Sequence, residues 1–237
     1  MTADRTILVD AILFDMDGYA LYPRFRTLID STPGVLKAWE LFSNDYNLGD
    51  SQKIAHETHG RRLYDTLKEY CKIDEEEKVH EEIDRFEDEV IRGGPVALPG
   101  ALELVQKLNS LPGAKWTICT SASNKYTPGA LAVAGVPIPE VGIVTSNDVS
   151  RGKPFPDPYL AGALRCGVDP KTCLIVEDAI SGLNSGRAAG AQVLAVCTST
   201  SKDRLIGGAT PDFVVPDLTG ISVSMVGGKI EVTIAEA

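Results

Sequence analysis

The chain has 237 residues, of which 43% are hydrophobic, and a formal net charge of −10. This length suffices for one large α/β domain or for a core with an inserted cap, and the composition is that of a globular protein. The acidic charge disfavours nucleic acid and anionic membranes as partners, because both bind basic surfaces.

The sequence contains no recognisable targeting or membrane signal. No basic start precedes an apolar stretch, no run approaches roughly 18 apolar residues, and no Asn-x-Ser/Thr sequon occurs. The five cysteines are odd in number and form no CxxC pair, which favours free buried thiols in a reducing compartment over disulfides or metal ligands. We therefore expect a cytoplasmic protein that does not bind membranes or nucleic acid, and we expect a monomer.

The first predicted strand, residues 12–14, ends in two carboxylates, Asp15 and Asp17, followed by Gly18. At the carboxyl end of a buried parallel strand, both side chains can face one reaction centre. Paired oxygen ligands suit Mg²⁺, and a carboxylate held beside a metal can attack phosphorus. A DxD sequence is also common in ordinary turns, so this pair alone does not establish a site.

Residues 31–92 are predicted to be helical and are strongly charged. The last predicted helix opens near Asp74 and places Val79, Ile83, Phe86 and Val90 on one face. Residues 93–95, Gly-Gly-Pro, then break the helix.

From residue 98 onward, predicted helices and strands alternate. Strands are expected at residues 115–120, 141–144, 173–176, 193–197 and 213–215, and helices from residue 100 and at residues 126–134, 157–166 and 179–189. This alternation indicates parallel pairing through right-handed crossovers, and Gly227 and Gly228 predict a terminal hairpin within residues 222–234. We predict a doubly wound parallel α/β core at residues 1–30 and 95–237, interrupted by an all-helical cap at residues 31–94.

Glycines recur every four residues in the predicted helix that follows residue 179. Gly182, Gly186 and Gly190 leave one stripe of this segment without side chains. Because polar residues intervene, we interpret the stripe as close packing of a helix on the sheet and not as a membrane dimer face.

Polar side chains follow four segments that should end at the same edge of the sheet. They are the Asp15 pair, Ser121, Lys153 and the Glu177–Asp178 pair. Taken singly, such a serine is usually a helix cap, a Lys-Pro pair usually lies at the surface, and Glu-Asp often caps a helix. Together they supply a nucleophile, metal ligands, a hydroxyl donor and a cation, which is the set that phosphoryl transfer requires.

With these motifs, the chain resembles the phosphatases of the haloacid dehalogenase superfamily that have a small helical cap. The matching segments are the DMDG sequence from Asp15, Ser121 in TICTSAS, Lys153 in RGKPFPDPYL and Glu177–Asp178 in LIVEDAISGLNSGRAAGA. Within the superfamily it is similar to fungal glycerol-phosphate and 2-deoxyglucose-6-phosphate phosphatases. The resemblance implies a Rossmann-like core and a small phosphorylated metabolite as substrate.

The resemblance also implies a role for each matching residue. Asp15 would form an aspartyl-phosphate, and Asp17 would protonate the leaving alkoxide and then activate water. Mg²⁺ would be held by Asp15, the main-chain carbonyl of Asp17 and Asp178, with Glu177 supporting these ligands.

The remaining implied roles concern the substrate. Ser121 and nearby backbone N–H groups such as that of Ala122 would bind phosphate oxygens, and Lys153 would balance charge on Asp15. In the cap, Arg62 or Arg61 and His59 could reach the substrate, although these residues equally fit the solvated start of a helix.

The chain departs from the family pattern directly after Gly18. Relatives continue from DxDG into T-L-x-D-S, whereas here Thr27–Ser31 comes eight residues late, after the segment Tyr19–Arg26. Three interpretations stay open: a tolerated longer flap in which Arg24 or Arg26 adds positive charge, a coding-boundary artefact that weakens or abolishes activity, or a new lid or partner contact. Long loops cost little closure entropy, so we expect the fold to survive.

Three rival functions follow from the same residues. A phosphosugar mutase of the superfamily carries a histidine in the first cap helix, where this chain has Val35. A dehalogenase would lack the second aspartate. From another class, the chain could be a catalytically impaired binding protein that keeps the pocket.

Overall fold

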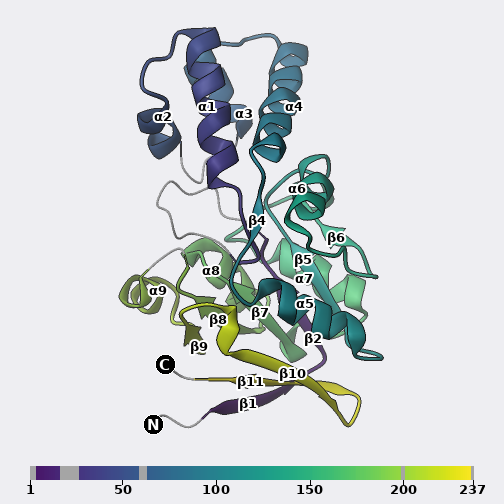
Figure 1. Cartoon of the computed structure of the whole chain (residues 1–237). Helices are drawn as coiled ribbons and strands as arrows, with labels where there is room; N and C mark the ends of the chain where they lie inside the picture. Colours follow the sequence, from purple (N-terminus) through teal and green to yellow (C-terminus); the bar gives the residue numbers. More distant parts are fainter. Residues whose placement is uncertain (1–3, 17–26, 59–62, 199–200, 236–237) are drawn as a thin grey trace.

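A computed structural model describes residues 4–16, 27–58, 63–198 and 201–235 (Figure 1). The predictions that concern Asp17, the segment Tyr19–Arg26 and the cap residues at positions 59, 61 and 62 lie outside these residues. In the described part of the chain, no helix is long and apolar enough to cross a membrane.

The core is a six-stranded parallel sheet in the order β6-β5-β2-β7-β8-β9. Its strands are β2 (Ala11–Phe14), β5 (Trp116–Cys119), β6 (Ile143–Val144), β7 (Cys173–Glu177), β8 (Gln192–Val196) and β9 (Phe213–Val215). The central strands β2, β5 and β7 are buried along their whole length, as expected for a sheet covered on both faces. The predicted doubly wound fold is therefore confirmed.

Helices cover both faces of this sheet (Figure 1). They are α5 (Ala101–Ser110), α6 (Tyr126–Ala134), α7 (Asp157–Cys166), α8 (Ile180–Ala188) and α9 (Lys202–Ala209), with short 3₁₀ helices η1 (Ser146–Asp148), η2 (Pro170–Thr172) and η3 (Leu218–Gly220). Alternate side chains of the strands divide between two apolar cores, because successive residues of a strand point to opposite faces. Phe14 packs in the core beneath α5 and α6, and Leu13 packs in the core beneath α7 and α8.

Four helices form the cap above the carboxyl edge of the sheet. They are α1 (Thr32–Tyr46), α2 (Ser51–Glu57), α3 (Leu63–Cys71) and α4 (Glu76–Arg92). Their shared core is aromatic: the ring of Phe86 lies 5.0 Å from that of Trp39 and 5.3 Å from that of Phe42, both in edge-on geometry. Two short antiparallel strands, β3 (Ile29–Asp30) and β4 (Val96–Ala97), join the cap to the core.

A second, three-stranded antiparallel sheet closes the far end of the molecule. The predicted hairpin is present as β10 (Ile221–Val226) and β11 (Lys229–Ile234), and its turn uses Gly227 and Gly228 at φ of 59° and 80°. An unpredicted strand, β1 (Arg5–Val9), pairs with β11 and brings the two ends of the chain together. The cysteines are free thiols, as predicted, and all but Cys197 are buried.

Candidate active site

Asp15 and Asp178 lie at neighbouring strand ends. The backbone N–H of Asp15 donates to the Val176 carbonyl at 2.9 Å and so continues the ladder between β2 and β7 by one residue. Asp178 follows directly after the last residue of β7. Because both strands are buried and apolar, the sheet ends where these carboxylates begin, and both are almost fully buried.

Lys153 reaches the same point from the loop that precedes α7. Its Nζ lies 2.6 Å from Asp15 Oδ1 and 2.6 Å from Glu177 Oε1, and only 6% of its side chain is exposed. The two buried carboxylates raise the pKa of Lys153, despite the opposing effect of its burial, so the side chain is an ammonium.

Glu177 is fully engaged by hydrogen-bond donors. Its Oε1 accepts from Lys153 and, at 2.8 Å, from the hydroxyl of Tyr159. Its Oε2 accepts from the backbone N–H groups of Asp178 and Ala179, each at 3.0 Å. These four bonds use the lone pairs of the carboxylate, so Glu177 is placed to fix Lys153 and the turn into α8.

Asp15, Glu177 and Asp178 form a buried acidic cluster whose oxygen atoms lie within 4.8 Å of one another. Among the described residues, the ammonium of Lys153 pairs with this cluster, and three carboxylates against one ammonium leave a formal excess of two negative charges. Burial raises the pKa of Asp15 to about 8, Lys153 opposes this shift, and Glu177 and Asp178 add to it. A divalent cation with hard oxygen preference would remove the excess, so the donor set fits Mg²⁺.

Thr27 belongs to this cluster, although the sequence analysis gave it no site role. Its buried hydroxyl lies 3.2 Å from Asp15 Oδ2 and 3.1 Å from Asp178 Oδ1. Because a hydroxyl has one proton, it donates to one of these oxygens at a time. The signal was present in the displaced T-L-x-D-S sequence, but its distance from Asp15 along the chain concealed the contact.

The segment that begins at Thr27 is anchored beside the site through one backbone carbonyl group, that of Met16. The backbone N–H groups of Leu28 and Ile29 donate to the Met16 carbonyl at 2.9 and 3.1 Å. Thr27 is therefore held beside Asp15 by the main chain, with ten residues between Met16 and Thr27.

The loop after β5 contains the predicted phosphate-binding residues. Ser121 is exposed there, one strand away from Asp15 in the sheet order. The N–H of Ala122 donates to Thr120 Oγ1 at 3.1 Å. The serine that contacts the start of α6 is Ser123, whose hydroxyl accepts from the N–H of Tyr126 at 3.0 Å, while Lys125 occupies the N-cap position. The alternative that Ser121 caps the helix is thus not the observed arrangement.

Tyr159 is the second residue that the sequence analysis did not assign to the site. It is completely buried on α7, its hydroxyl donates to Glu177, and its ring lies 5.1 Å from Lys153 Nζ. It stands six residues after Lys153 in the RGKPFPDPYL segment, and the first turn of α7 brings its hydroxyl to Glu177. An aromatic face toward an ammonium adds cation–π attraction.

A family model for haloacid dehalogenase-like hydrolases matches residues 9–190. Hexitol phosphatase A of Escherichia coli is 37% identical, over 90% of this chain and 93% of that protein. Glycerol-1-phosphate phosphohydrolase 1 of Saccharomyces cerevisiae is 30% identical over 86% and 81% of the two chains. The 2-deoxyglucose-6-phosphate phosphatase 1 of the same yeast is 30% identical over 90% of each.

Solved structures show the same architecture. A hydrolase from Pseudomonas syringae superimposes with a TM-score of 0.65 and 26% identity, covering 88% of this chain and 93% of that one. A β-phosphoglucomutase from Clostridium difficile gives a TM-score of 0.66 at 17% identity, covering 89% and 92%. At that identity the second comparison concerns the fold alone.

Proposed function

The chain belongs to the haloacid dehalogenase-like hydrolases, and from this premise we propose a Mg²⁺-dependent phosphatase of a small sugar or polyol phosphate. The observation that supports it best is Asp15: a buried carboxylate at a strand end, paired with Lys153 at 2.6 Å and adjacent to Asp178. The named substrates of the three similar phosphatases are hexitol, glycerol and deoxyhexose phosphates. A neutral polyol or sugar carrying one phosphate is their common chemistry.

In the proposed reaction, one oxygen of Asp15 attacks phosphorus and the ester P–O bond breaks. The bonding electrons leave with the alkoxide oxygen, which takes a proton from Asp17. Water then attacks the phosphorus of the aspartyl-phosphate, Asp17 takes the proton of that water, and the Asp15 carboxylate leaves as inorganic phosphate is released. Asp17 has this role by family resemblance, since it lies outside the described residues.

The other residues of the site would balance the negative charge and fix the positions of the reacting groups. Lys153 offsets negative charge on Asp15 and on the transferring group, and Glu177 and Tyr159 fix the ammonium in place. Asp15 and Asp178 would hold Mg²⁺ together with the Asp17 carbonyl, and Thr27 would orient both carboxylates. When bound, the cation supplies charge stabilisation for the phosphoryl oxygens. Ser121 would donate to one of those oxygens.

The phosphosugar mutase is a weaker candidate. Val35 lies in the first cap helix where mutases of the superfamily carry a histidine, and it is buried in the apolar core. This position therefore offers no group for proton transfer.

Phosphate release from a substrate panel tests the proposal. The panel contains p-nitrophenyl phosphate, hexitol phosphates, glycerol phosphate and 2-deoxyglucose 6-phosphate, each with Mg²⁺ or with EDTA. We expect turnover with Mg²⁺ only, and we expect Asp15→Asn to lose on the order of a thousandfold or more in kcat. The control Asp203→Asn changes an exposed aspartate on α9 and should keep full activity.

Two outcomes would contradict the proposal. Full turnover by Asp15→Asn would remove the assigned nucleophile. A wild-type chain that releases no phosphate from any ester, together with an inactive variant lacking Tyr19–Arg26, would favour the binding-protein alternative. Activity in the deleted form alone would show that this segment is inhibitory.

A further inference from the structure

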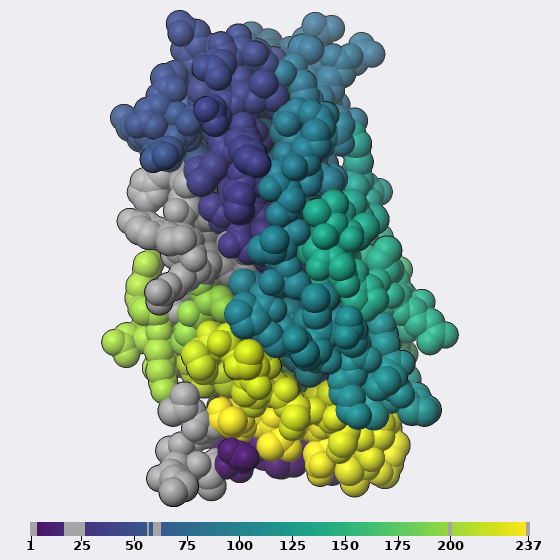
Figure 2. All heavy atoms as spheres, in the orientation of Figure 1, coloured from purple at the N-terminus to yellow at the C-terminus, as the bar shows by residue number. Residues whose placement is uncertain are grey.

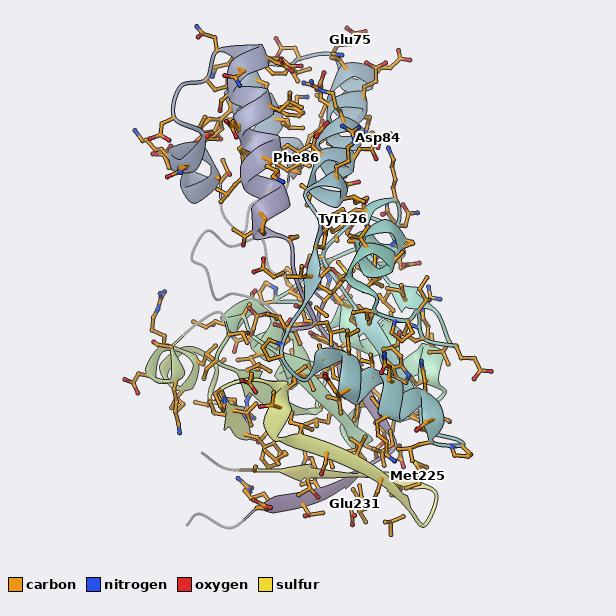
Figure 3. All side chains as sticks on the ribbon, in the orientation of Figure 1. Glu75, Asp84, Phe86, Tyr126, Met225 and Glu231 are labelled. Atoms are coloured by element: carbon orange, nitrogen blue, oxygen red, sulfur yellow. The ribbon has the colours of Figure 1, made fainter. Side chains whose placement is uncertain are left out.

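One face of α4 in the cap lies directly on α6 and the loop that precedes it. Asp84, Glu87 and Ile91 follow one another on this face at helical spacing. Figure 3 shows Asp84 above Tyr126, which begins α6. On the side of the molecule seen in Figure 2, the spheres of α4 lie against those of α6.

The three residues make three different contacts with the core. Asp84 Oδ2 pairs with Lys125 Nζ at 2.9 Å, in an ion pair of which both side chains are about half exposed. Glu87 Oε2 accepts from the Ser123 hydroxyl at 2.8 Å. Ile91 packs so close to Gly129 that a Cβ there would lie 2.8 Å from its Cδ1.

Of the three residues on this face, Glu87 is the buried one: 6% of its surface is exposed, whereas Asp84 is exposed and Ile91 is partly exposed. Burial raises the pKa of its carboxyl; Asp84 and Asp88 add to this shift, and Ser123 and Lys125 oppose it. A buried carboxyl group is costly to hold in place, whereas an apolar residue would pack there without that cost.

The partner of Glu87 is a central residue of the predicted phosphate-binding loop. Ser123 donates to Glu87, accepts from the N–H of Tyr126 and accepts from Thr127 Oγ1 through its carbonyl at 2.7 Å. It lies two residues after Ser121. The Ser123 hydroxyl donates to Glu87 of the cap and accepts from the N–H of Tyr126 in α6 of the core. It therefore links the cap and the core at this loop.

We infer that Glu87 is a positioning residue of the cap that sets the conformation of the loop containing Ser121, through its hydrogen bond to Ser123. This inference rests on the proposed function, since it assigns that loop to phosphate binding. The β3–β4 connection joins cap and core covalently, and the Glu87–Ser123 bond adds a polar link at the loop itself. Placement of the cap and phosphate affinity are thereby coupled.

The test compares Glu87→Ala, Glu87→Gln and Ser123→Ala with the wild type in the full chain. Glu87→Gln keeps a carbonyl oxygen that accepts from Ser123, and should retain near wild-type behaviour. Glu87→Ala should raise KM and the Kd for inorganic phosphate with Mg²⁺ roughly fivefold to tenfold, the effect of one lost hydrogen bond of ordinary strength. The matched control Asp84→Asn removes the exposed ion pair on the same face, and should leave both constants unchanged.

Hydrogen exchange at the Tyr126 amide provides a readout that is independent of turnover. Loss of the Glu87 contact frees the Ser123 hydroxyl, so exchange at this amide should become faster in Glu87→Ala and remain slow in Asp84→Asn. A double variant of Glu87→Ala with Ser123→Ala should be no weaker in phosphate binding than the worse single variant. If Glu87→Ala does not fold, Glu87→Leu fills the same space without a polar group and replaces it.

Three results would overturn the inference. They are unchanged phosphate affinity in Glu87→Ala or its replacement, an equal loss in Asp84→Asn, and additive losses in the double variant. A wild-type chain that hydrolyses no phosphate ester would refute the proposed function instead. In that case, the exchange rates of Tyr126 alone decide whether Glu87 positions the loop.

Discussion

Thr27 is the side chain that contacts both Asp15 and Asp178, the two carboxylates proposed to bind the metal. Its hydroxyl is about equally distant from Asp15 and Asp178, and it is completely buried. A donor shared between two carboxylates fixes their separation without adding charge, which is the usual role of groups that contact metal ligands.

Replacing Thr27 by valine keeps the shape of the side chain and removes the donor. We expect Thr27→Val to fold and to bind Mg²⁺ roughly tenfold more weakly, because Asp15 and Asp178 lose their common partner. Isothermal titration with Mg²⁺ alone measures this without turnover. Thr27→Ser keeps the hydroxyl and should bind as the wild type does; equal affinity in the valine variant would show that the hydroxyl has no positioning role.

Among the secondary-structure elements, α8 determines the space that is available to Glu177, because Gly182 and Gly186 on its inner side have no side chains. A Cβ on Gly182 would fall 1.6 Å from Glu177 Oε1, and a Cβ on Gly186 would meet Val193 and Ile175 at 2.8 and 2.9 Å. The prediction of close helix–sheet packing is confirmed for these two glycines, whereas Gly190 lies beyond the end of α8, with a φ of 86°, and faces Lys171. The first of these glycines also gives the Glu177 carboxylate its space, because no other residue type leaves that volume empty.

Gly182→Ala should therefore displace Glu177 and, with it, Lys153. We expect a loss of about 1–3 kcal/mol in unfolding free energy from overpacking, and a loss of activity on the order of a hundredfold from the misplaced ammonium. Chemical denaturation and p-nitrophenyl phosphate turnover measure the two effects.

Gly207→Ala is the matched control for that variant. Gly207 lies in α9, and nothing approaches a Cβ built there within 4 Å. The added methyl group should raise the unfolding free energy by up to about 1 kcal/mol through helix propensity and leave turnover unchanged. If Gly182→Ala and Gly207→Ala have the same unfolding free energy and the same turnover, the site tolerates displacement of Glu177.

Elements built from local patterns could be predicted, and those built from distant contacts could not. The strands that contain Phe14, Ile118 and Val176 are short apolar runs that end in polar residues, so both their existence and the composition of their ends were evident. β1 is separated from β2 by Asp10 alone, and its partner Ile234 lies more than two hundred residues away. Thr27 reaches the site through the return of the chain to Met16, and Tyr159, although it lies in the segment that contains Lys153, reaches Glu177 through the packing of α7 against the sheet.

For the molecule as a whole, the excess negative charge of the site links stability to pH and to cations. Asp15 has a pKa of about 8 in the folded chain and an ordinary value near 3.8 when unfolded. The folded state thus holds the proton more tightly. The stabilisation from this group is complete below about pH 4 and is lost as the pH rises through about 8.

Thermal unfolding at pH 5 and pH 8 tests this linkage. With EDTA, the Tm of Asp15→Asn relative to that of the wild type should increase with pH, because the variant has no carboxylate to ionise. Mg²⁺ should raise the wild-type Tm more at pH 8 than at pH 5. At pH 8, a hundredfold excess of Mg²⁺ over its Kd should add about 2.7 kcal/mol to the unfolding free energy. An equal Mg²⁺ effect at both values would contradict the assigned pKa shift.

The Met16 carbonyl, to which Leu28 and Ile29 both donate, has a consequence for how such a protein can diversify. Met16 and Leu28, which flank residues 17–27 of the chain, are thus held at nearly one point of the framework. Mutations that lengthen, shorten or replace residues beyond Gly18 in this interval leave Thr27 and the start of the cap anchored as before. Natural selection can therefore vary this stretch as a cassette, and laboratory libraries can do the same, without rebuilding the catalytic framework.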